Sequence, residues 1–246
     1  MHRFHISSEN LSGDKITISD KKQVHHIKDV LRLKAKDKVT VFDTAGNEYT
    51  ADIEKISSRN INLKIREKRV FMACEKFQIT VACALPKKSK MDDIIDKLTQ
   101  LGVDRIIPLK TSRVVVKLDR HKEMLCQGRW KKIAQSASEQ AQRNTLPVID
   151  AVKDIGKVLS ESGDFDLKLI PTLGGERKDL KEVFIHSHPD KVLVFIGPEG
   201  DFTDEEIDLA KKSGCIPVSL GNLVLRVETA ALSIVSFMRL YEPRTF

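Results

Sequence analysis

Arg226 and Glu228 are the two residues of this sequence whose types and spacing most strongly suggest chemistry. They flank Val227 in the stretch LGNLVLRVETAAL, where an apolar helix is predicted to begin. A carboxylate in the first turn of a helix is stabilised by the helix dipole, so Glu228 could be a capping residue alone. An arginine at the same end gains nothing from the dipole. It needs another reason, either a pair with Glu228 or contact with an anionic ligand or a developing negative charge.

Three segments in the last third of the chain follow one pattern, in which an apolar strand ends in Gly, Pro or Thr. They are LIPTLGGE at 169–176, FIGPEGDFT at 195–203 and SLGNLVLRVETAAL at 219–232. In an open α/β sheet, ligands bind outside the carboxyl ends of the strands. Gly197 and Gly200 leave backbone N–H and C=O groups accessible, which suits a ligand with its own donors and acceptors, such as an adenine ring. Each segment alone could be an ordinary turn, but the three together predict one pocket.

Several common chemistries are excluded by missing motifs. The sequence has no G-x-G-x-x-G, so it lacks both the dinucleotide-binding turn and the glycine-rich loop of ordinary Rossmann methyltransferases. It has no P-loop motif and no G-x-S-x-G nucleophile elbow. The histidines form no H-E-x-x-H, and the four cysteines (Cys74, Cys83, Cys126, Cys215) form no C-x-x-C. We therefore expect no metal site and no disulfide framework.

The elements that must position these residues fall into two parts. The first part is predicted to be a small β-barrel with one helix: strands at 15–18, 38–43, 48–56 and 60–65, and a helix over 21–33. After about Phe77, strands alternate with helices. The strands are predicted at 78–85, 104–109, 166–172, 191–197 and 215–220, and the helices at 90–101, 129–143, 179–187, 203–213 and from 227 onward. This alternation predicts an α/β domain with a mainly parallel sheet. The charged run REKRVFMACEK marks a boundary near residue 72, which gives domains 1–72 and 73–246.

Charge is distributed unevenly between the two parts of this 246-residue chain, whose net charge is +7. Residues 1–150 carry 30 Lys and Arg against 19 Asp and Glu, while residues 151–246 carry 12 against 16. Such segregation suggests a partner rich in phosphate, although a solvated basic surface is an equal alternative on charge alone. No apolar run is long enough to cross a membrane, and the first residues lack the apolar core of a signal peptide. We expect a cytoplasmic protein without membrane contact.

The motifs GPEGDFTDEE and LGNLVLRVETAAL, preceded by a strand ending in PTL, resemble those of the SPOUT methyltransferases. Within them the RsmE family is the most similar; it methylates N3 of a uridine in 16S ribosomal RNA. The resemblance extends over essentially the whole chain, because HHIKDVLRLKAKDKVTVFD is similar to the family's N-terminal PUA-like RNA-binding barrel. It implies a C-terminal α/β trefoil knot, S-adenosylmethionine as cofactor, 16S ribosomal RNA or the small ribosomal subunit as partner, and a homodimer whose second chain helps to complete the site.

The resemblance also implies which residues hold the cofactor, mostly through backbone groups. They are Pro171, Thr172, Leu173, Ile196, Gly197, Pro198, Glu199, Gly200, Ser219, Leu220, Gly221, Leu225 and Arg226. Four positions depart from the family pattern. Asp201 stands where a third glycine is common, Leu223 where an arginine is common and Val227 where a threonine is common. Gln100 begins the sequence Gln-Leu-Gly where Glu-Leu-Gly would be usual.

The substrate that the resemblance implies suggests roles for the first two residues. Uracil N3 is a poor nucleophile until its weakly acidic proton leaves, so methyl transfer needs a base or stabilisation of the uracil anion. Arg226 is the candidate stabiliser, and Glu228 is the candidate base or orienting group. Candidate RNA contacts are Arg3, Arg32, Lys87, Lys88, Lys90, Arg113, Arg129, Lys132 and Arg143. Two alternatives stay open: a methyltransferase of the same superfamily acting on another RNA, and a non-catalytic RNA-binding protein of ribosome assembly.

Overall fold

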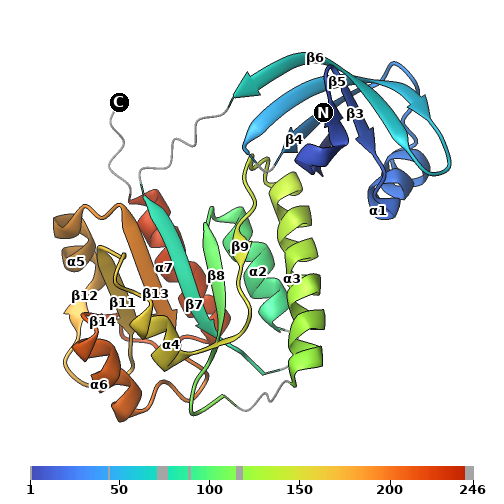
Figure 1. Cartoon of the computed structure of the whole chain (residues 1–246). Coiled ribbons are helices and arrows are strands. Elements are labelled where there is room, and N and C mark those ends of the chain that lie inside the picture. Colours follow the sequence, from blue (N-terminus) through green and yellow to red (C-terminus); the bar gives the residue numbers. More distant parts are fainter. Residues whose placement is uncertain (1, 44, 71–76, 88–89, 115–118, 242–246) are drawn as a thin grey trace. The chain divides into compact units, whose positions relative to one another are not determined.

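The structure is a computed structural model that describes residues 2–43, 45–70, 77–87, 90–114 and 119–241 (Figure 1). Its chain divides into two compact units. One comprises residues 1–74 together with 138–146, and the other comprises 75–137 together with 147–246. The boundary predicted near residue 72 lies outside the described residues. Residues 138–146, which the sequence places in the second domain, belong by their contacts to the N-terminal unit.

The N-terminal unit is built on a six-stranded sheet with the order β1-β4-β5-β6-β3-β2. Its strands are β1 (His2–Ile6), β2 (Leu11–Ser12), β3 (Lys15–Ile18), β4 (Lys38–Asp43), β5 (Asn47–Ile56) and β6 (Ile61–Val70). The pairs are antiparallel except for β1 with β4. The four predicted strands are therefore confirmed. Their alternating side chains, among them Ile16, Val41 and Leu63, are buried in one hydrophobic core.

The predicted helix over 21–33 is shorter than expected and changes its geometry along its length. It begins as α1 (Lys21–His25), where the Asp20 side chain accepts hydrogen bonds from the backbone N–H of Lys22 and Gln23. It continues as η2 (His26–Val30), a turn of π-helix. A separate 3-10 turn, η1 (Ser8–Asn10), follows β1. Arg32 then adopts a left-handed backbone with φ of 52°, which ends the helix.

The C-terminal unit is built on an eight-stranded parallel sheet with the order β10-β8-β7-β13-β11-β14-β12, and β9 also pairs with β8. Its strands are β7 (Gln78–Ala84), β8 (Arg105–Lys110), β9 (Val148–Ile149), β10 (Lys153–Asp154), β11 (Leu167–Pro171), β12 (Lys178–Asp179), β13 (Lys191–Ile196) and β14 (Ile216–Ser219). The helices are α2 (Lys90–Gln100), α3 (Arg120–Gln140), α4 (Ile155–Ser160), α5 (Leu180–Ser187), α6 (Asp204–Lys212) and α7 (Val227–Leu240).

Helices cover both faces of this sheet, as the alternation of β13 shows. Val192 and Val194 face a core shared with α2, α5 and α7. Leu193 and Phe195 face a second core shared with α4 and α6. Because successive side chains of a strand point to opposite faces, a continuous apolar strand between two helical layers is what a buried parallel sheet requires (Figure 1). The predicted α/β class with a mainly parallel sheet is confirmed, and the trefoil knot stays a prediction.

Two helices of this unit differ from the sequence prediction and one agrees with it closely. Helix α3 begins at Arg120, about two turns before the predicted start at 129, and α4 was not predicted. Helix α6 begins with the predicted capping box: the Thr203 side chain accepts from the Glu206 N–H, and the Glu206 side chain accepts from the Thr203 N–H. Glu206 also accepts hydrogen bonds from the backbone and hydroxyl of Ser112, so the cap ties α6 to the segment after β8.

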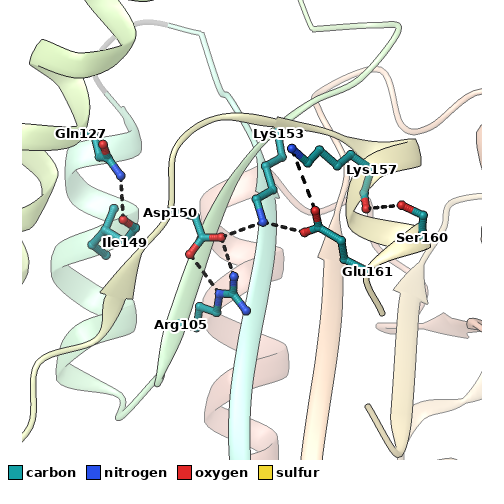
Figure 2. A network of polar contacts seen from close by, with 8 residues as sticks. All are labelled: Arg105, Gln127, Ile149, Asp150, Lys153, Lys157, Ser160 and Glu161. Atoms are coloured by element: carbon teal, nitrogen blue, oxygen red, sulfur yellow. Dashed lines mark hydrogen bonds and ion pairs between the residues drawn. The ribbon is translucent and has the colours of Figure 1, made fainter. Parts of the chain in front are cut away.

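An ion-pair network joins β8, β10 and α4 at one side of the sheet (Figure 2). The Arg105 guanidinium donates to both oxygens of Asp150, at 2.9 and 2.7 Å. Lys153 lies between two carboxylates, 3.1 Å from Asp150 and 2.7 Å from Glu161. Burial alone would raise the pKa of Asp150, but the hydrogen bonds and charges of Arg105 and Lys153 outweigh it and hold that pKa below its ordinary value.

Replacing Asp150 by alanine is expected to lower the free energy of unfolding by about 2 kcal/mol at pH 7, because it leaves two half-buried cations without their shared partner. A carboxyl whose pKa is depressed by folding stabilises the fold above its unfolded pKa of about 4, and that stability is lost as pH falls through the folded pKa. Urea titrations should therefore show the difference from wild type shrinking from pH 7 to pH 3. The control is Asp164→Ala, an exposed carboxylate of the same unit. An equal loss from both variants would contradict the network's role.

Candidate functional site

An open cavity of about 600 Å³ lies at the carboxyl ends of β11, β13 and β14. These three strands are neighbours in the sheet, in the order β13-β11-β14. The segments that follow them therefore meet, together with the first residues of α7, as the sequence predicted for 169–176, 195–203 and 219–232. Most of the predicted cofactor residues line the cavity: Pro171, Thr172, Leu173, Ile196, Gly197, Pro198, Glu199, Leu220, Gly221 and Leu225.

The predicted cofactor residues and the residues that line the cavity do not match completely. Gly200, Ser219 and Arg226 do not line the cavity but each adjoins a residue that does. Sequence reasoning missed Arg177, Asp201, Leu223, Val224, Val227 and Ala230 as lining residues. The missed residues all lie inside or just beyond the three segments, so a prediction by whole segments rather than by motif letters would have included them.

Two glycines leave backbone groups exposed on the cavity wall. A Cβ added at Gly197 would lie 3.1 Å from the ring of Phe202, which is fully buried below the loop. Gly221 has a φ of 108°, a backbone conformation that residues other than glycine rarely adopt. The apolar side chains of Ile196, Leu220 and Val227 complete the wall. A wall of this kind suits a flat, partly apolar ligand whose polar edge can bond to backbone groups.

The segment after β13 is held from outside by Arg113. Its guanidinium donates to the backbone carbonyls of Gly200 at 2.6 Å and Phe202 at 3.1 Å. On the other side, the Glu199 carboxylate accepts from the Lys87 N–H at 3.1 Å. These bonds fix the loop, and the predicted contact of Arg113 with RNA stays a prediction.

Glu228 forms an ion pair with Lys90, whose ammonium lies 2.6 Å from its carboxylate. The hydrogen bond from Lys90 lowers the pKa of Glu228 below its ordinary value, and the nearby charge of Arg226 acts in the same direction. A carboxylate with a lowered pKa is a weak base, so the geometry favours Glu228 as an orienting group over Glu228 as the base. Lys90, predicted to contact RNA, is likewise engaged within the protein.

Arg226 occupies the position just before the first residue of α7, with its side chain exposed to solvent. Its neighbours Leu225 and Val227 both line the cavity. Within the described part of the chain, Arg226 forms no ion pair and makes no side-chain capping bond. A cation left uncommitted at the mouth of a cavity can meet an anionic ligand or a charge that develops during reaction.

The other predicted RNA contacts divide into committed and exposed cations. Arg3 pairs with Glu48 and its guanidinium stacks over Phe42, with only 11% of its side chain exposed, so most of its side chain is engaged within the protein. Arg129 lies 2.9 Å from Asp92, and Arg143 donates to Thr145. Arg32, Lys87 and Lys132 are exposed. Lys88 lies outside the described residues.

A second basic feature, which the sequence analysis did not single out, lies in the N-terminal unit. Lys21, Lys28, His25 and Arg59 line an open groove of about 1000 Å³, with Asp29 paired to His25 at 2.7 Å. Their sequence separation explains why they were missed, since Arg59 lies on the turn between β5 and β6, far along the chain from α1.

Other kinds of site find little support in the described residues. Among them, no group of three His, Cys, Asp or Glu side chains could hold a metal ion. Cys83, at the end of β7, is fully buried, and burial raises the pKa of its thiol to about 12, which leaves the thiolate too rare to act as a nucleophile. No helix within the described ranges is long and apolar enough to cross a membrane.

Comparisons with known proteins agree with this geometry. Residues 73–239 match the family model of an RNA methyltransferase domain, and residues 13–66 match that of an RNA methyltransferase PUA domain. Ribosomal RNA small subunit methyltransferase E of Rickettsia conorii is 30% identical to this chain, over 97% of this chain and 95% of that protein.

Two solved structures are similar over nearly their whole length. A Legionella pneumophila protein in complex with the bound cofactor SAM has a TM-score of 0.89 and 31% identity, over 97% of each chain. Ribosomal RNA small subunit methyltransferase E of Neisseria gonorrhoeae, bound to S-adenosyl methionine, has a TM-score of 0.87 and 27% identity, over 98% of each chain. The parallel α/β sheet with its PUA unit and three-segment cavity is that of an RNA methyltransferase. This chain belongs to the ribosomal RNA small subunit methyltransferase E family.

Proposed function

We propose that this protein transfers a methyl group from S-adenosylmethionine to N3 of a uridine in 16S ribosomal RNA. The observation that carries the proposal is the cavity at β11, β13 and β14, whose backbone-lined wall and uncommitted Arg226 lie at one place. Family membership and the cofactor bound in two similar structures support it. The division of labour would follow domains 1–72 and 73–246, with the first binding RNA and the second transferring the methyl group.

The cavity fits the cofactor in its chemistry, because apolar side chains and exposed backbone groups line the same wall. Ile196, Leu220 and Leu225 offer apolar contact to a purine ring, while the backbone at Gly197 and Gly221 offers hydrogen bonds. When bound, S-adenosylmethionine supplies an electrophilic methyl group on a sulfonium.

The protein's own residues then have two tasks, to orient the uracil and to stabilise its deprotonated form. The guanidinium of Arg226, which is exposed to solvent, would stabilise the negative charge that develops on the ring as the N3 proton passes to water. The Lys90–Glu228 pair would hold the start of α7, and with it Arg226, in a fixed position. RNA phosphates would be bound by exposed cations, including Arg32, Lys132 and those of the groove at Lys21, Lys28 and Arg59.

We further propose that the protein acts as a homodimer in the cytoplasm, where small subunits are assembled. Leu223 and Val224 support a second chain beside the cavity, because these apolar side chains are 78% and 76% exposed at its mouth. Light scattering on the eluting peak of a gel-filtration column would give a mass of twice 27.8 kDa. A monomeric mass would contradict the dimer and leave the methyl-transfer proposal standing.

The decisive experiment is methyl transfer from labelled S-adenosylmethionine to purified small ribosomal subunits, followed by nucleoside analysis of the RNA. Label in N3-methyluridine of 16S ribosomal RNA is the expected result. Label in another nucleoside or another RNA would favour a relative with a different target. Failure to bind the cofactor by calorimetry would favour a non-catalytic protein of ribosome assembly.

The Glu228→Gln variant is expected to lower kcat severalfold and to leave the shape of the pH profile between pH 6 and pH 9 unchanged. The reason is that the lowered pKa of Glu228 keeps it ionised throughout this range, so its titration cannot limit the rate. Lys90→Met should have a similar effect, because it breaks the same pair. A profile that loses its alkaline or acid limb in Glu228→Gln would restore the carboxylate as the general base.

A further inference from the structure

Asp201 is held in a backbone conformation that suits glycine better than aspartate. Its φ is 60°, in the left-handed region, and its N–H closes a turn onto the Pro198 carbonyl at 2.9 Å. The resemblance described above places a glycine at this position. When a residue other than glycine adopts this conformation at a binding site, we expect its side chain to make an interaction that offsets the conformational cost and that glycine cannot make.

The side chain of Asp201 makes two such interactions. Its Oδ1 accepts from the Phe202 N–H and its Oδ2 accepts from the Leu173 N–H, each at 2.8 Å. Phe202 lies in the segment after β13, but Leu173 lies in the segment after β11, 28 residues earlier. One carboxylate therefore ties together two of the three segments that form the cavity, and both Leu173 and Asp201 line it.

Asp201 lies in the wall between two cavities. Asp201 and Thr172 line the cavity described above and also a second cavity of about 800 Å³, whose other lining residues include Glu176 and Lys211. Arg113 holds the carbonyls on either side of Asp201, those of Gly200 and Phe202. Arg113 thus fixes the segment after β13. Within the described residues, the Leu173 N–H is hydrogen-bonded to that segment by Asp201 alone.

We propose that Asp201 is a positioning residue for S-adenosylmethionine. Its carboxylate holds the Leu173 segment against the 197–202 segment, so that the cavity is formed before the cofactor enters. The inference rests on the proposed function, because it assumes that this cavity is the cofactor site. Asp201 acts through the backbone of Leu173, and its carboxylate needs no contact with the cofactor. Preorganised sites bind more tightly because less order must be imposed on binding.

The Asp201→Gly variant separates this role from a general contribution to stability. Glycine removes the carboxylate but also relieves the left-handed backbone. The Kd for S-adenosylmethionine, measured by calorimetry, should rise about tenfold, which corresponds to about 1.4 kcal/mol. The Tm of the cofactor-free protein should stay at or above that of wild type. In Asp201→Asn, which tolerates the same backbone and keeps one acceptor oxygen, the Kd should lie between those of wild type and Asp201→Gly.

His188→Gly is the matched control, because His188 also has a left-handed backbone, with φ of 42°, at the end of α5. It should change the Tm in the same direction without changing the Kd. A wild-type Kd in Asp201→Gly would overturn the proposal, and so would a rise in Kd accompanied by a lower Tm. Failure of wild type itself to bind S-adenosylmethionine would overturn the proposed function first, so the two failures are distinguishable.

Discussion

Replacing Arg226 by alanine is expected to lower the kcat of methyl transfer by about 100- to 1,000-fold, the range found when a group that stabilises a developing anion is removed. The Kd for S-adenosylmethionine should change little, because Arg226 is not among the residues that line the cavity. Its side chain is exposed, and in the described part of the chain it has no ion-pair partner that would compete for it. Single-turnover rates and calorimetry on the same preparations measure the two quantities.

Two further variants define the role of Arg226. Arg226→Lys keeps the charge without the planar fork and should recover part of the rate. Lys212→Ala removes an exposed charge at the end of α6 and should leave kcat near wild type. If the Kd of Arg226→Ala rose as much as its kcat fell, Arg226 would be a cofactor-binding residue and the stabilising role would be wrong.

Replacing Gly197 by valine is expected to weaken S-adenosylmethionine binding by at least about tenfold, a loss of roughly 1.4 kcal/mol. Even the first added carbon would lie 3.1 and 3.2 Å from the Phe202 ring and 3.4 Å from the Asp201 carboxylate. Phe202 is 2% exposed in the core shared with α6, so the ring has little room to withdraw. The backbone at 197 must shift instead, and that backbone lines the cavity.

Overpacking of this kind should also lower the free energy of unfolding of Gly197→Val by about 1–3 kcal/mol. Gly128→Ala is the matched control, because a Cβ at Gly128 meets no atom within 4 Å and the residue lies within α3. It should keep both stability and cofactor affinity. Wild-type affinity in Gly197→Val would show that the segment after β13 does not form the cofactor site.

The sequence predicted the site's location better than its individual contacts. Strand ends rich in Gly and Pro at 169–176, 195–203 and 219–232 have a local signature, and a parallel sheet brings neighbouring strand ends together without further information. Ion pairs have no such signature. Glu228 and its partner Lys90 are 138 residues apart, and Arg3 and Glu48 are 45 apart. Counting charges could not show that Arg3, Lys90 and Arg113 are committed within the protein.

The fold shows the same division between local and distant information. The Thr203–Glu206 capping box was predicted because all its atoms lie within one turn. Helix α4 has only six residues, and β9, β10 and β12 have two each, which is too short for a periodic pattern to be recognised. The early start of α3 was missed because Met124 and Leu125 are exposed, which obscures the amphipathic pattern of its first turns.

The return of residues 138–146 to the N-terminal unit has a consequence for how the protein is made. The Glu139 carboxylate accepts from the His5 N–H at 2.9 Å and from the Gln23 side chain at 3.1 Å, so the later segment completes hydrogen bonds of the first strand and first helix. During translation, the opening seventy residues emerge long before these partners do. The amino-terminal unit can reach its final form only after residues 75–137 of the other unit have left the ribosome, and a gene fragment ending near codon 72 would encode an unfinished fold.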